Sequence, residues 1–85
     1  MIDAHVLNEW VVNEDRHAGS SDIVTDFEVV VPGLFADTRN ARDTATWRAE
    51  FVANGEVQHA EIRDKPYTTD EGIVYTVRVD TLRYW

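Results

Sequence analysis

Histidines and carboxylates are the residues of this chain that could bind a metal ion or perform acid-base chemistry. The three histidines are His5, His17 and His59. No two of them are close enough in sequence to form an HxH or HxxxH pair, so a metal site would require them to converge through folding. We expect solvated or ion-paired histidines instead, with His17 in a polar loop.

Glu50 and Glu61 are the nearest candidates for a pair of catalytic carboxyls. In the hairpin predicted below, Arg48 faces Glu61 and Glu50 faces His59, so opposite charges alternate on one face. A catalytic carboxyl needs a desolvating pocket that shifts its pKa. A chain of 85 residues also has little room for a cleft of roughly 300 Å³. We therefore predict no catalytic residue, no enzyme activity, no metal and no cofactor.

Other chemical motifs are missing from the sequence. Ser20 and Ser21 lack a GxSxG context, and neither GxxxxGK[ST] nor GxGxxG occurs. The acidic stretch 70–72 is much shorter than the loop of about twelve residues that binds calcium. The four glycines therefore indicate turns.

Composition indicates an acidic protein with a thin core. Its 85 residues predict a single domain spanning 1–85, which buries only about 60–65% of its unfolded surface. Lys and Arg number 8 and Asp and Glu 16, and the net charge of −8 argues against direct nucleic-acid binding. Lys65 is the only lysine, a pattern typical of a halophilic or high-GC source. Without cysteine, disulfides and thiol chemistry are excluded.

The sequence shows no sign of membrane insertion or secretion. No apolar run approaches the roughly 20 residues that span a bilayer. The first ten residues carry early acid instead of the basic region of a signal peptide. We expect an intracellular or virion location.

The stretch 46–63 predicts a β-hairpin around the Asn-Gly pair at 54–55. A type I′ turn needs positive φ at both central residues, which Asn and Gly tolerate. The resulting register places Trp47 opposite Ile62 and turns Phe51 to the same apolar face. A slip by one residue would expose both aromatic rings, so this register is preferred.

Apolar side chains alternate in three further segments. This period predicts strands over 2–13, 23–31 and 73–84, the second of them in the centre of the sheet. Residues 14–22 form a polar loop in this interpretation. For 34–45 we expect at most one short helix, because no sustained apolar stripe follows.

Five strands with short connections predict a mainly β fold. We expect a small antiparallel meander curled into a barrel or sandwich, in which the last hairpin strand ends at 64–66. The predicted core consists of Val6, Trp10, Val12, Phe27, Val29, Trp47, Phe51, Ile62, Tyr75 and Val77. If the sheet stays open, its edges invite strand addition by another chain.

Aromatic residues near the C-terminus suggest a protein-binding role. Trp85 has no local reason for its position, and it either plugs a barrel end or docks into a neighbouring molecule, where Trp and Tyr are favoured anchors. The predicted partner-binding residues are Trp85, Tyr84, Tyr67 and Arg83.

Two hypotheses of function follow. The first is a non-enzymatic structural protein, such as a viral protein of the virion or a part of another large complex, that forms a homo-oligomer or a multi-protein assembly. The alternative is an acidic inhibitor that mimics nucleic acid and blocks a DNA- or RNA-binding enzyme. The interspersed arginines count against this alternative, because they lie among the acids of the hairpin and the last strand: Arg48, Arg63, Arg78 and Arg83. We favour the first hypothesis.

Overall fold

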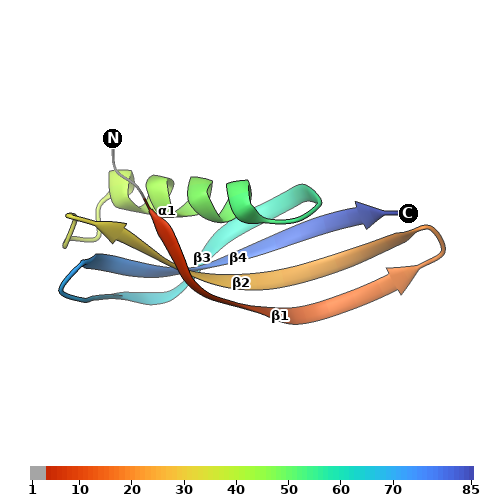
Figure 1. Ribbon diagram of the computed structural model, residues 1–85, viewed down its shortest axis with the longest axis horizontal. Coiled ribbons are helices and arrows are strands. Elements are labelled where there is room, and N and C mark those ends of the chain that lie inside the picture. The colour runs from red at the N-terminus through yellow and green to blue at the C-terminus, as the bar shows by residue number, and fades with distance from the viewer. Residues whose placement is uncertain (1–3) are drawn as a thin grey trace.

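The computed structural model describes residues 4–85, which form one sheet and one helix. In chain order the elements are β1 (His5–His17), β2 (Ser20–Pro32), α1 (Arg39–Val52), β3 (Glu56–Thr68) and β4 (Gly72–Tyr84). All neighbouring strands are antiparallel, in the order β1-β2-β4-β3, and α1 lies along one face of the sheet (Figure 1). The mainly β prediction is confirmed. The described residues form four strands instead of five, and the sheet does not close into a barrel.

The predicted hairpin over 46–63 is wrong in its first half. That half belongs to α1, and the Asn-Gly pair joins α1 to β3. A Cβ at Gly55 would lie 2.9 Å from the Arg83 Cγ and 3.0 Å from the Leu82 carbonyl oxygen, and its φ is +116°. Glycine therefore serves a close approach to β4 instead of a type I′ turn. The second half of the hairpin is confirmed as a strand, β3.

A stripe of alanines explains why this segment is helical. Ala41, Ala45 and Ala49 follow one another at intervals of one turn and are completely buried. Their small side chains let α1 lie close to the sheet. At the start of the helix, the Thr38 hydroxyl accepts a hydrogen bond from the Ala41 amide at 3.1 Å and caps the first turn. The short helix expected over 34–45 therefore starts later and runs further.

The other strand predictions are confirmed with different bounds. β1, β2 and β4 match the predicted strands over 2–13, 23–31 and 73–84, and β2 is an inner strand as expected. Residues 2 and 3 lie outside the described residues. Most of the predicted loop 14–22 instead extends β1 and β2, which a tight turn connects.

β3 continues through 64–66, where it was predicted to end. Its pairing with β4 is interrupted after Arg63 and resumes with Tyr67 opposite Val74. Asp64, inside the interruption, has a φ of 59°. An edge strand tolerates Pro66 because the amide that proline lacks is not needed by a further strand.

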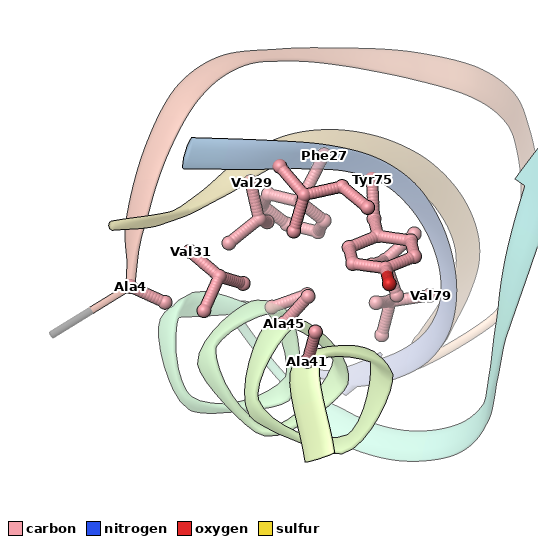
Figure 2. Close-up of a cluster of buried hydrophobic side chains, with 11 residues drawn as sticks. Ala4, Phe27, Val29, Val31, Ala41, Ala45, Tyr75 and Val79 are labelled. Carbon is pink, nitrogen blue, oxygen red and sulfur yellow. The ribbon is translucent and has the colours of Figure 1, made fainter. Parts of the chain in front are cut away.

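The hydrophobic core lies between α1 and the sheet, which curls around the helix (Figure 2). Four of the predicted core residues are buried there: Phe27, Val29, Tyr75 and Val77. Two others, Val6 and Ile62, are partly buried at its margin. Four are exposed, which makes their assignment wrong: Trp10, Val12, Trp47 and Phe51. The first two lie on the edge strand β1, and the last two lie on the outer side of α1.

The helix is much shorter than the strands it packs against. Each strand has 13 residues, which corresponds to about 43 Å, and the molecule measures 44 × 23 × 19 Å. α1 has 14 residues and extends for about 21 Å. The β1–β2 turn and the C-terminus therefore project beyond the end of α1 (Figure 1).

Candidate functional site

The three histidines do not converge. Each lies near a carboxylate, and all three side chains are more than half exposed. From Nε2 to the nearest carboxylate oxygen, the distances are 3.5 Å for His5–Glu71, 3.5 Å for His17–Asp15 and 4.0 Å for His59–Glu61. The predicted pairing of His59 with Glu50 is wrong, because Glu50 lies on α1.

The predicted checkerboard around Glu50 and Glu61 does not form. Glu61, on β3, lies opposite Arg78 of β4 and has an oxygen 3.7 Å from Arg63 Nη1. Among residues 4–85, no three His, Asp or Glu side chains come close enough together to hold a metal ion.

The sheet face turned away from α1, here called the open face, carries an ion pair between the two inner strands. Arg78 donates hydrogen bonds of 2.9 and 3.1 Å to the two oxygens of Asp26. Asp26 is only 5% exposed, and its hydrogen bonds raise the pKa of Arg78. A bidentate pair of this kind fixes both partners, so we interpret it as a structural contact between β2 and β4.

Two carboxyls also meet on the open face. Asp22 lies opposite Leu82 and Asp80 lies opposite Val24, which makes the two aspartates diagonal neighbours. A hydrogen bond with Asp22 and burial raise the pKa of Asp80. His59 of β3 lies opposite Asp80 and acts to lower its pKa, and within 4–85 no three such side chains come close enough to hold a metal ion. The pair is a pH-sensitive contact between β2 and β4.

On the other face, a cluster of three side chains ties α1 to the sheet. The buried Tyr75 donates its hydroxyl to Asp37 Oδ1 at 2.7 Å, and Arg42 donates to both Asp37 oxygens at 2.7 and 2.9 Å. The hydrogen bonds from Arg42 and Tyr75 lower the pKa of Asp37 to about 2. Burial and the same hydrogen bond raise the pKa of Tyr75 to about 12. These groups keep their charge states across the neutral range, so the cluster is structural.

Three of the predicted partner-binding residues lie together at the end of β4. Tyr84 and Trp85 are 66% and 70% exposed. The Trp85 amide donates to the Gly19 carbonyl oxygen at 3.1 Å, which places it beside the β1–β2 turn. Arg83 donates from Nε to the Asn54 carbonyl oxygen at 3.0 Å. Their role in partner binding stays a prediction.

Tyr67 lies at the other end of the sheet. It pairs with Val74, about 33 Å along β4 from Tyr84. Its hydroxyl donates to Glu28 Oε2 of β2 at 3.1 Å, so its ring spans the width of β4. Burial and this hydrogen bond raise the pKa of Tyr67. Tyr67 therefore belongs to a different surface from the other three predicted residues.

The most exposed pair of large aromatic residues within one element lies on α1. Trp47 and Phe51, here called the aromatic ridge, are 65% and 79% exposed and lie one turn apart on the side opposite the buried alanines. The Arg48 guanidinium lies 5.4 Å from the centre of the Phe51 ring, a cation–π contact that leaves most of the ring in solvent. Interpreting Ala41, Ala45 and Ala49 as the buried stripe would have revealed this ridge from the sequence.

A second exposed apolar group lies along the edge strand β1. Leu7, Trp10, Val11 and Val12 are between 43% and 57% exposed. Leu7 and Val12 fall where the pairing with β2 shifts by one residue, so they are the extra residues of two β-bulges.

Comparison with known proteins does not narrow the function. No protein-family model matches the chain, and no curated protein and no solved structure matches it. Within 4–85, no helix has the length and apolar character that crossing a membrane requires.

Proposed function

We propose that this chain is a non-enzymatic structural protein that works by binding other proteins in an assembly, such as a virus particle or another large complex. The observation that carries this proposal is the aromatic ridge. Trp47 and Phe51 are 65% and 79% exposed although the chain has few large apolar side chains to fill its core. Side chains of this type act as anchors at the centre of protein interfaces.

Covering the ridge would release substantial free energy. A large aromatic side chain buries 150–250 Å², so the exposed parts of Trp47 and Phe51 together amount to about 300 Å². At about 25 cal/mol per Å², their burial supplies about 8 kcal/mol before the entropy of association is subtracted. Two adjacent side chains can thus provide the main anchor of an interface.

The C-terminal residues offer a further contact surface. Tyr84 and Trp85 project past the end of α1, and the hydrogen bonds of Arg83 and Trp85 to neighbouring loops hold this end in place. A surface that is already held in place loses little entropy on binding. We include Arg83, Tyr84 and Trp85 among the proposed contact residues.

The alternative, an acidic inhibitor of a nucleic-acid-binding enzyme, has less support. A nucleic-acid mimic presents rows of carboxylates to a basic groove. On the open face, Arg78 and Arg63 lie among the acids, and Arg42 and Arg48 lie on α1. Strong dependence of partner binding on salt would favour the inhibitor, whereas weak dependence favours the apolar ridge.

The test is gradient sedimentation of extracts from the source that produces the protein. We expect the wild-type chain to sediment with a complex far larger than one chain, and the double variant Trp47→Ser, Phe51→Ser to shift to the slow fractions. Phe35→Ser is the matched control, because Phe35 is 55% exposed but lies outside α1. A wild-type chain that sediments alone, or a double variant that stays in the complex, would contradict the proposal.

A further inference from the structure

The two edges of the sheet differ in how well they are protected from pairing. On β3, the interruption at 64–66 contains Asp64 with positive φ, the lysine Lys65 and Pro66. Charges, proline and bulges are the devices that keep an edge strand from recruiting another strand. The middle of β1 has one charge, Glu9, among four exposed apolar side chains. β1 has two bulges, at Leu7 and Val12, but neither a proline nor a residue with positive φ, so it is the less protected of the two edges.

Nothing among residues 4–85 covers the outer side of β1. The strand pairs with β2 and touches α1, and it has no strand on its other side. We infer that β1 pairs with β1 of a second copy of this chain, antiparallel and centred on Trp10. This inference rests on the proposed assembly function and names the partner of a surface other than the aromatic ridge.

The bulges of β1 determine which registers are possible. Pairing with β2 assigns each regular residue of β1 to one face of the sheet. On the α1 side lie Val6, Glu9, Val11, Glu14 and Arg16. On the open face lie His5, Asn8, Trp10, Asn13 and Asp15. A continuous sheet requires each residue to meet a residue of the same face.

Pairing centred on Trp10 meets this requirement on both sides of the bulges. Its regular pairs are Trp10–Trp10, Glu9–Val11, Val6–Glu14 and His5–Asp15, each between the two copies. Every one of these pairs joins residues of the same face. No like charges meet, and the outermost pair sets an imidazole opposite a carboxylate.

Neighbouring registers are less favourable. Centring on Glu9 sets the two Glu9 carboxylates directly opposite each other. Centring on Val11 sets Glu9, on the α1 side, opposite Asn13, on the open face. A register that pairs Glu9 with Arg16 preserves the faces but sets Trp10 against Asp15. The register centred on Trp10 is the one that also joins apolar surface across the axis.

A second copy fits this edge better than an unrelated strand does. The pairing is the same seen from either copy, so it is closed by a two-fold axis and stops at two chains. The product is one continuous eight-stranded sheet, whose outer edges are the two protected β3 strands. A foreign strand would need its own match to the two bulges.

Disulfide trapping tests the register. The chain has no cysteine, so one substitution introduces a single thiol. With oxidised glutathione, Trp10→Cys should form a covalent dimer, because position 10 faces itself across the axis. Asn8→Cys is the control on the same face, since its two copies would lie about 13 Å apart, too far for a disulfide. Equal cross-linking of both variants, or of the control alone, would overturn the inference.

Sedimentation equilibrium tests the surface without a disulfide. The wild-type chain should dimerise as its concentration rises toward about 1 mM. Val11→Glu should weaken the dimer at least tenfold, because it sets a second carboxylate opposite Glu9 of the other copy. The double variant Trp47→Ser, Phe51→Ser should leave this dimer unchanged. A wild-type monomer throughout the range would overturn the β1 dimer and leave the proposed function standing. A dimer lost only in the double variant would have the same consequence. A β1 dimer in a source that contains no larger complex would instead contradict the proposed function and leave the β1 dimer standing.

Discussion

The helical structure and the hairpin interpretation predict opposite orders of stability for two substitutions on α1, Trp47→Ala and Ala45→Leu. Trp47 is 65% exposed, so Trp47→Ala removes about 70 Å² of buried surface, or about 1.7 kcal/mol. The higher helix propensity of alanine returns about 0.5 kcal/mol, which leaves a net loss near 1 kcal/mol. Ala45 is completely buried, so Ala45→Leu overpacks the contact between helix and sheet and should lose about 1–3 kcal/mol.

Urea unfolding followed by far-ultraviolet circular dichroism measures both effects. This signal does not depend on the tryptophan that one variant removes, and a low protein concentration keeps association out of the measurement. In a hairpin, Trp47 would be a core residue, and Trp47→Ala would lose about 3–5 kcal/mol while Ala45→Leu changed little. That result would refute the helical packing described here.

Three further variants test local contacts. Thr38→Ala should lose about 1 kcal/mol in urea unfolding, because it removes the cap of α1; no loss would contradict the capping role. Tyr75→Phe should lose about 1 kcal/mol at pH 7, because the buried ring loses its hydrogen bond to Asp37, and a neutral result would refute that bond. Asp22 and burial raise the pKa of Asp80 in the folded chain. The stability that protonated Asp80 contributes is therefore fully present below its ordinary pKa of 3.8, and it is lost as the pH rises through the raised pKa. Asp80→Asn should therefore be more stable than wild type at pH 7 and equal to it near pH 3, and urea midpoints that moved in parallel at both pH values would contradict this.

The strands were predictable where alternation had a single interpretation. In β2 and β4, Val and Ile recur with period two, and both are inner strands whose helix-side residues are buried. β3 was found because Gly55 marks its start in either interpretation. The chain from 46 to 53 fits two periods, because Trp47, Ala49 and Phe51 alternate with polar residues, while alanines recur at every fourth position from 41 onward. Weighing residues by size favoured the aromatic pattern, yet the small residues are the ones that face the sheet.

The surfaces were less predictable than the strands. Exposure of Trp10 depends on β1 lying at an edge, and strand order is set by contacts between distant parts of the chain. Exposure of Trp47 depends on the helix. The cap at Thr38, three residues before Ala41, was the available local signal for α1, and its combination with Ala45 and Ala49 predicts the outer ridge.

The central claim is that this chain works through an exposed aromatic surface that other proteins cover. Hydroxyl-radical footprinting of the chain, free and within the complex isolated from its source, measures this directly. We predict that Trp47 and Phe51 react readily in the free chain and are protected at least tenfold in the complex, while Phe35 changes little. Equal labelling of Trp47 and Phe51 in both states would contradict the claim.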